Sequence, residues 1–189
     1  MSDDNKIWRA QTYALLANLF SQAPVQMILG HIAAIEVTEP DSPMGKQWQN
    51  LVAVAKKASV TDLAAEYQTL FIGVTHGELI PYGSYYQTGF LMEEPLAELR
   101  ADLGKLGLVK HDDTAEPEDH ISAQCDVMRL ILMAEGTPIV TDKEFFHHHL
   151  KPWLINFFTD LESTKTSEFY QVVGEFGKVF INMELSEYR

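Results

Sequence analysis

Cysteine and long apolar runs are nearly absent from this sequence, and each absence narrows what the protein can be. The 189 residues include one cysteine, Cys125, which excludes an intramolecular disulfide and any metal site built from clustered cysteines. No stretch approaches the roughly 18 consecutive apolar residues that a membrane-spanning helix needs. Residues 1–6 are polar and acidic, unlike the basic start of a secretory signal peptide. We therefore expect a cytoplasmic protein.

The short motifs of nucleotide-binding and hydrolytic enzymes are absent as well. The 11 glycines are scattered, so neither a phosphate-binding loop nor a dinucleotide fingerprint occurs. Ser84 does not lie in a nucleophile elbow, and Cys125 lies in an apolar stretch, where a thiol is usually inert. We expect no catalytic residue and no cofactor, and nucleotide binding has no phosphate loop to support it.

Basic residues are scarce, because 14 Lys and Arg stand against 27 Asp and Glu, which gives a net charge of −13. Such a protein repels nucleic-acid phosphates and anionic membranes and attracts cationic partners. The charge is concentrated, since residues 93–126 hold ten acids and three bases and carry −7. Binding of a cationic partner is one interpretation of this segment, and solubility alone is the other.

What the sequence has in abundance is helical periodicity around an aromatic-rich core. Hydrophobic residues make up 46%, with 10 Phe, 7 Tyr and 3 Trp, and many recur at three- and four-residue spacing. No segment has a strand pattern of sufficient length, so we predict an all-α helical bundle. Residues 74–92 lack the helical period and are predicted to form an ordered aromatic loop packed on the core. Nine or so helices are expected, at about 4–20, 24–35, 44–57, 59–73, 95–107, 117–135, 141–151, 153–161 and from 166 onward.

The polar segment 109–115 is the best candidate for a hinge. Pro117 follows it and suits the first turn of a long helix, since proline is favoured there. A hinge loop can allow a lobe to be exchanged between two chains, so a monomer and a domain-swapped dimer are both open. We predict one domain, 1–189, with an N-terminal lobe over about 1–108, a hinge over about 109–116 and a C-terminal lobe over about 117–189.

Metal-ligand residue types occur in one helical segment. Glu144 and His147 share a helix face, but a di-iron bundle needs two such pairs and two further glutamates. His147, His148 and His149 point in three directions around a helix and cannot chelate together while it stays helical. The stretch from Thr141 to Glu144 also fits a capping box, which gives Glu144 a structural role. We therefore assign no metal ligand.

The densest group of functional residue types lies at the predicted start of the helix that follows the hinge. Carboxylates there are favoured by the helix dipole and can act as caps. Asp119 can also accept hydrogen bonds from a guanidinium, and His120 could respond to pH near neutrality. Structural and binding roles are therefore both open. The alternative function is a helical metal-dependent hydrolase or oxidoreductase, whose ion needs five converging ligands: Glu116, Asp119, His120, Glu144 and His147.

Three short motifs occur along the chain in an order that is typical of one protein family. They carry, in order, Tyr67, Leu70, Phe71 and Gly73, then Pro81, Tyr82, Ser84 and Tyr86, then Glu116, Pro117, Asp119 and His120. A fourth stretch has the look of the same family: Phe145, Phe146, Leu150, Pro152 and Trp153. The chain thereby resembles the TorD/DmsD/NarJ family of redox-enzyme maturation chaperones, and most of all its TorD branch. The resemblance covers nearly the whole chain, with Glu118 where the pattern often has a second proline.

The resemblance implies an all-helical cytoplasmic chaperone and not an enzyme. Family members bind the precursor of a molybdoenzyme, often at its twin-arginine signal peptide, and hold it back from export until the molybdenum cofactor is inserted. They assist protein folding and complex assembly in this way. By resemblance, Asp119 and His120 belong to the signal-peptide site and Glu116 and Pro117 shape it. Seven further residues line or support its groove: Tyr67, Leu70, Phe71, Pro81, Tyr82, Ser84 and Tyr86.

The chemistry of such a peptide agrees with the residues that are present. A twin-arginine signal presents two adjacent guanidinium groups followed by an apolar stretch. An acidic segment for the guanidinium groups and a groove rich in Tyr and Phe for the apolar stretch both occur here. The sequence leaves open which enzyme is the client and which surface would contact the mature client or the cofactor-insertion machinery.

Overall fold

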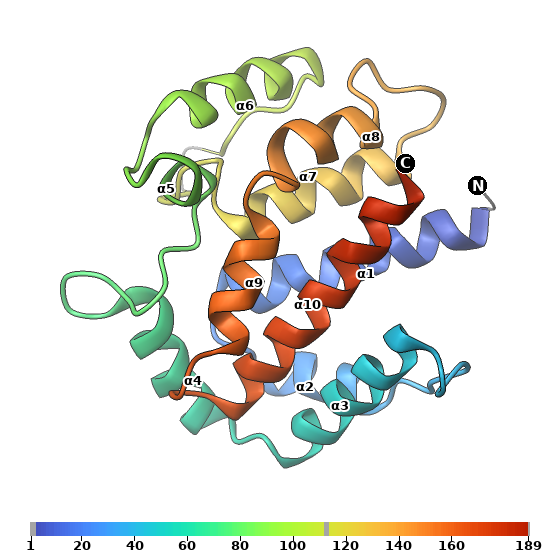
Figure 1. Cartoon of the computed structure of the whole chain (residues 1–189), viewed down its shortest axis with the longest axis vertical. Coiled ribbons are helices and arrows are strands. Elements are labelled where there is room, and N and C mark those ends of the chain that lie inside the picture. Colours follow the sequence, from blue (N-terminus) through green and yellow to red (C-terminus); the bar gives the residue numbers. More distant parts are fainter. Residues whose placement is uncertain (1–2, 112–113, 189) are drawn as a thin grey trace. The chain divides into compact units, whose positions relative to one another are not determined.

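The computed structural model describes residues 3–111 and 114–188, and over these residues the chain is all-α, as predicted (Figure 1). Ten α-helices and two π-helical segments are present in this part of the chain, with no strand beyond an isolated bridge between Tyr82 and His120. None of the described helices combines the length and the apolar character needed to cross a membrane. The helices group into two compact units, and each unit is assembled from two separate stretches of chain.

The first unit combines the chain up to Ser21 with Pro81–Trp153. Helix α1 packs along α7 in this unit (Figure 1), with Tyr13 fully buried. Arg9 is also buried, and its Nη1 lies 3.2 Å from Oδ2 of Asp142, which ties α1 to the start of α8. The elements of this unit are α1 (Asp3–Ser21), α5 (Gly83–Thr88), α6 (Glu94–Lys105), α7 (Ile121–Met133), α8 (Asp142–Phe145) and η2 (Phe146–Leu150).

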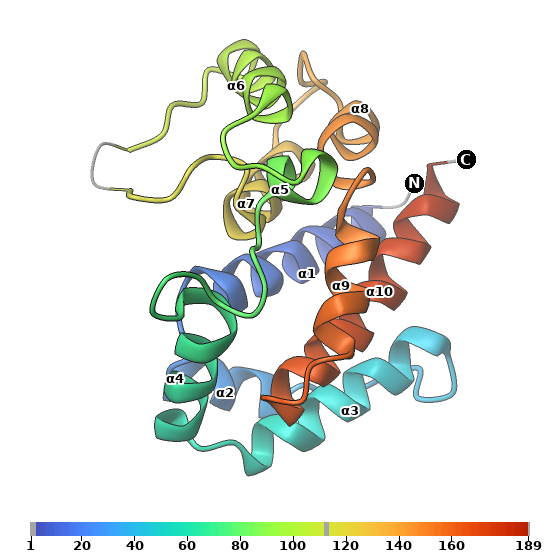
Figure 2. The ribbon, with the colours of Figure 1, turned by 60° about the vertical axis from the view of Figure 1, so that its left-hand side comes forward.

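The second unit combines Gln22–Ile80 with the chain from Leu154 onward. Its last two helices form a hairpin, and α10 also packs on α3 (Figure 2), where Trp48 meets Phe176 edge to face with ring centroids 4.5 Å apart. The elements of this unit are α2 (Gln26–Ala33), α3 (Pro43–Lys57), α4 (Val60–Tyr67), η1 (Gln68–Ile72), α9 (Leu154–Glu162) and α10 (Glu168–Glu187).

Local capping chemistry sets several helix ends where the sequence predicts them. The Ser59 hydroxyl accepts a hydrogen bond from the Asp62 amide and begins α4, and the capping box between Thr141 and Glu144 begins α8. Gly73, at φ 63°, ends η1 in a conformation that a residue with a Cβ rarely adopts. These ends are predictable because each depends on a few neighbouring residues.

Two of the secondary-structure predictions are wrong: one helix was not predicted, and one helix begins later than expected. The stretch 74–92 contains helix α5, which at six residues is too short to show a helical period in the sequence. Pro117 does not open the following helix, because α7 begins at Ile121 and His120 is its N-cap. The Nδ1 atom of His120 accepts the Ser122 amide hydrogen at 3.2 Å, so an imidazole replaces the capping carboxylate that the sequence predicted.

The predicted hinge, 109–116, follows α6 and precedes α7, and both of these helices belong to the first unit. Residues 112–113 of this hinge lie outside the described residues. Helix α1 groups with α7 and helix α3 groups with α10, so contacts in each unit join stretches from either side of the hinge. The division into lobes at this segment, and the exchange of a lobe between chains, stay predictions.

We expect Gly177→Ala to destabilise the second unit. A Cβ at Gly177 would lie 2.2 Å from Cε1 of the fully buried Phe158, so this ring or the helices that carry it would have to shift to admit the methyl group. Overpacking of this kind costs about 1–3 kcal/mol of unfolding free energy, measurable by urea unfolding followed by circular dichroism. The matched control is Gly30→Ala, in α2 of the same unit, where a Cβ meets nothing within 4 Å. The control should be neutral or slightly stabilising, and equal losses in both variants would refute the packing argument.

Candidate functional site

Two of the three predicted motifs, residues 81–86 and 116–120, adjoin each other in the first unit. The segment before α5 runs beside the segment before α7, although the two are about 35 residues apart in the chain. The structure therefore brings eight of the eleven predicted site residues into one unit: Pro81, Tyr82, Ser84, Tyr86, Glu116, Pro117, Asp119 and His120. Three hydrogen bonds with backbone N–H donors join the segments: Gly83 N to Asp119 O at 2.9 Å, Ser84 N to Asp119 Oδ2 at 2.8 Å, and Ile121 N to Pro81 O at 3.0 Å. A side-chain hydrogen bond from Tyr82 to Glu116 also joins them.

Asp119 is the residue that joins the two segments, and it is 2% exposed. Its carboxylate accepts the Ser84 amide hydrogen at the start of α5, and its carbonyl oxygen accepts from Gln124 Nε2 at 3.0 Å. A buried carboxylate is tolerated only when hydrogen bonds such as the one from Ser84 replace its hydration. Asp119 therefore positions backbone in this structure, while the hydroxyl of Ser84 is buried without a hydrogen-bond partner.

His120 is also buried, at 6% exposure, and contacts both Tyr82 and the start of α7. Its ring lies edge to face against Tyr82, with centroids 5.0 Å apart, and its Nδ1 caps α7. Burial lowers the pKa of His120 from 6.5 to about 4, so the ring is neutral at pH 7. The expectation that His120 responds to pH near neutrality is therefore wrong, because the ring titrates in the acid range.

The exposed carboxylate of the motif belongs to Glu116. The phenol of Tyr82 donates a hydrogen bond to it, which orients the carboxylate at the surface. The neighbouring Glu118 is engaged differently, because Arg100 donates to both of its oxygens at 3.0 and 2.8 Å. These hydrogen bonds lower the pKa of Glu118 and hold the carboxylate within the protein. Glu116 and Tyr82 are thus the acidic and aromatic pair that this motif presents to solvent.

Gln124 and Trp153 complete the site, and the sequence analysis did not assign them to it. The indole Nε1 of Trp153 donates to His149 O at 2.8 Å and lies 3.3 Å from Gln124 Oε1, and its ring lies 5.7 Å from that of Tyr86. A Cβ at Gly83 would lie 3.0 Å from Gln124 Nε2 and 3.2 Å from this indole nitrogen, so a larger residue there would require these side chains to shift by a few tenths of an ångström. The signal for Trp153 was the fourth stretch of family-like residues, in which it is the last.

The other three predicted site residues lie in the second unit, at the junction of α4 and η1. Leu70 and Phe71 are buried, and Tyr67 is half-buried. The ring of Tyr170 lies 5.1 Å from Phe71 and 6.2 Å from Tyr67, so α10 covers this aromatic cluster. Within the second unit these residues make a packed core edge, and their share in a peptide groove stays a prediction.

The five-ligand metal site that the alternative function requires is not formed. Over the described residues, only Asp102, His148 and His149 form a group of three or more potential ligands within 4.8 Å of one another. The Glu144 carboxylate instead accepts from the amide and hydroxyl of Thr141 at 2.9 and 2.8 Å. Cys125 is fully buried, and burial raises the pKa of its thiol, so it stays protonated and inert as predicted.

The buried imidazole predicts a pH dependence of stability. Because the pKa of His120 is lower in the folded than in the unfolded chain, its stabilising contribution is complete above pH 6.5 and is lost as the pH falls toward about 4. The loss amounts to about 3 kcal/mol. His120→Asn replaces the Nδ1 acceptor at the N-cap by an amide oxygen and removes the titration. The difference in unfolding free energy between wild type and variant should change across this window, and a difference independent of pH would contradict the assignment.

Comparison with known proteins supports the family resemblance that the motifs indicated. The family model of the nitrate reductase delta subunit matches residues 38–159. Chaperone protein TorD of Vibrio atlanticus is 24% identical over 198 residues, which cover 93% of this chain and 92% of the relative. A protein of Haemophilus influenzae named probable Tat proofreading chaperone DmsD is 28% identical over 131 residues, which cover 68% of this chain and 63% of the relative.

The fold has a solved counterpart. A crystal structure described as a candidate redox enzyme maturation protein from Archaeoglobus fulgidus aligns with a TM-score of 0.64 at 21% identity, over 94% of this chain and 93% of the other. That likeness confirms the predicted TorD-like helical fold. Since the family model covers well over half of the residues, the chain belongs to the nitrate reductase delta subunit family, the NarJ/TorD family that its motifs predicted.

Proposed function

We propose that this chain is a chaperone that binds the twin-arginine signal peptide of a molybdoenzyme precursor and holds the precursor until its cofactor is inserted. The observation that supports this most directly is the joining of the two motif segments by Asp119, in a chain matched along 93% of its length by a named chaperone. Retention of a precursor before export requires the chaperone to act in the cytoplasm, which completes the proposal.

Some residues of the proposed site contact the peptide, and others hold the backbone that positions them. Glu116 supplies the exposed carboxylate for a guanidinium, and Tyr82 orients it through the phenol hydrogen bond. Asp119 and His120 act through the backbone, because the first holds the start of α5 and the second caps α7. Pro117, between Glu116 and Asp119, limits the conformations of the loop that carries them.

An apolar surface for the rest of the peptide lies in the same unit. Phe90, Leu91 and Met92 follow Gly89, the C-cap of α5, and are 68%, 47% and 72% exposed. Contiguous exposed apolar side chains mark interaction surfaces more often than chance would produce them. A signal peptide has its apolar stretch after the two arginines, so we assign that stretch to these three residues.

The affinity expected for such a peptide is moderate. A free signal peptide is disordered, and ordering it on binding costs on the order of 2–5 kcal/mol of the interaction energy. A chaperone that later releases its client to the export machinery needs this property. The alternative function, a metal-dependent enzyme, has no support, because the five residues that it requires as ligands do not converge and the relatives described above are named chaperones.

We expect titration calorimetry to detect a twin-arginine signal peptide from an exported molybdoenzyme, with binding that depends on the arginine pair. Glu116→Gln should weaken it about tenfold to a hundredfold, since a charged hydrogen bond contributes about 1.5–3 kcal/mol. The control is Glu135→Gln, which removes the same charge from an exposed acid in the same unit.

Three outcomes would count against the proposal. Equal binding of a peptide whose two arginines are changed to alanine would remove the basis for recognition by charge. Equal weakening by Glu116→Gln and Glu135→Gln would show an effect of net charge alone. Absence of binding to any of several such peptides would direct attention to recognition of the mature client.

A further inference from the structure

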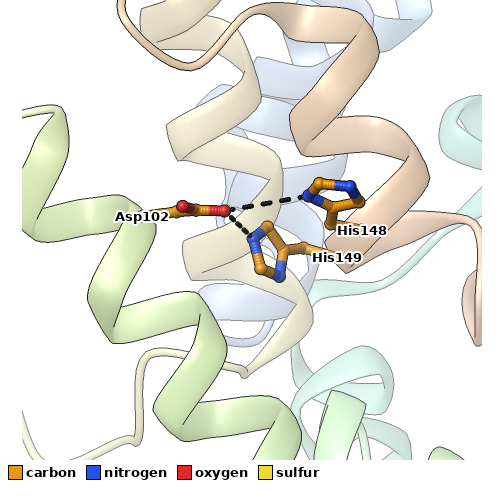
Figure 3. Close-up of side chains that lie close together, drawn as sticks. All are labelled: Asp102, His148 and His149. Atoms are coloured by element: carbon orange, nitrogen blue, oxygen red, sulfur yellow. Dashed lines mark hydrogen bonds and ion pairs between the residues drawn. The ribbon is translucent and has the colours of Figure 1, made fainter.

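A second group of polar side chains lies outside the motif segments of the first unit. Asp102 comes from α6, and His148 and His149 come from η2 (Figure 3). The Nε2 atom of His149 lies 2.8 Å from Oδ2 of Asp102, and the Nδ1 atom of His148 lies 4.0 Å from the same oxygen. Neighbouring histidines from one segment therefore face one carboxylate oxygen.

This convergence differs from the sequence expectation that consecutive histidines point apart. The turn that carries them is π-helical, closed by Lys151 N donating to Phe146 O at 2.8 Å, and is wider than an α-helical turn. His148 uses the ring nitrogen nearer its backbone and His149 the farther one, so unequal reach compensates for their different directions. His147 remains outside the group, with its ring against Phe146.

The charges around the group favour a cation. Asp102 is 8% exposed and its other oxygen, Oδ1, accepts from Lys105 Nζ at 2.6 Å, so Oδ2 is the atom shared by both rings. Glu98 acts electrostatically on His149, and Glu144 on His148, each from four residues before a member of the group. The side chain of His148 is 65% exposed, which gives an ion and its water a route from solvent.

We infer that Asp102, His148 and His149 form a binding site for a divalent first-row transition ion, with Zn²⁺ as the reference case. Two imidazole nitrogens and one carboxylate oxygen are the donors that Zn²⁺ binds at about 2.0–2.2 Å, with water in the fourth position. Tetrahedral donors at such bond lengths lie about 3.3 Å apart, between the 2.8 and 4.0 Å separations observed here. Hard ions such as Mg²⁺ prefer oxygen ligands and fit less well.

Binding replaces the hydrogen bond between His149 and Asp102 and forms three metal–ligand bonds, one each to Asp102, His148 and His149. The hydrogen that His149 Nε2 shares with Asp102 gives way to the ion, and the imidazole carries its proton on Nδ1 instead. Lys105 keeps its hydrogen bond to Oδ1 and so holds the liganding carboxylate in place. The ion would then join α6 to η2, an assignment that is independent of peptide binding.

The test is calorimetry of Zn²⁺ with the full chain carrying no affinity tag, beside two matched variants. We expect one ion per chain at micromolar or tighter affinity. His148→Gln, an exposed position, should weaken binding about tenfold or more and leave the metal-free helical spectrum unchanged. His147→Gln, one residue away but outside the group, should bind as the wild type does.

A visible Co²⁺ absorption band should follow the same pattern and report the ligands directly. Wild-type affinity in His148→Gln would overturn the assignment, as would no binding of Zn²⁺ by the wild type. Equal losses in His147→Gln and His148→Gln would overturn it too, because the ion would then be held nonspecifically by the histidine run. Asp102→Asn gives a second check, since it should weaken binding while keeping the shape of the side chain.

Discussion

The buried carboxylate of Asp119 is the constraint from which the site follows. A carboxyl group at 2% exposure is tolerated only if the fold supplies hydrogen bonds in place of water. The amide of Ser84 meets that need, and in doing so begins a helix too short to form by its own propensity. Two segments that belong to different parts of the sequence are thereby fixed side by side. The surface residues Glu116 and Tyr82 inherit their relative positions from this junction.

Further hydrogen bonds connect Asp119 to the interior of the first unit. Gln124 donates to the carbonyl of Asp119, and the indole of Trp153 lies at 3.3 Å from the oxygen of the same Gln124 side chain. That indole donates to the carbonyl of His149, whose ring contacts Asp102. One chain of hydrogen bonds thus leads from the motif segments to the Asp102, His148 and His149 group. Networks of this kind contribute to a unique arrangement when every member is satisfied.

Local features of the fold were predictable from the sequence, and features made by distant residues were not. Ser59 and the capping box at Thr141 begin helices through neighbours within three residues, so their chemistry can be recognised in the sequence. Helix α7 begins four residues after Pro117 because Asp119 and His120 are committed elsewhere, to Ser84 and to the cap. The meeting of Asp102 with His149 spans 47 residues and depends on a π-helical turn, for which no sequence rule exists. Asp119 and His120 stood out by residue type, whereas the other two motifs were assigned to a site only through resemblance to a family.

The number of acidic residues in a segment does not show how many carboxylates can bind a partner. The acids of residues 93–126 suggested a broad surface for a cationic partner. In the structure several of them already have partners within the chain. Asp126 pairs with Arg129, Glu118 with Arg100, Asp102 with Lys105 and His149, and Asp119 with a backbone amide. A guanidinium that approaches an engaged carboxylate must displace its partner, whereas Glu116 is exposed and already oriented by a phenol. Under the proposed function, selectivity for an arginine pair depends on the oriented carboxylate of Glu116, and the remaining negative charge raises the rate of encounter.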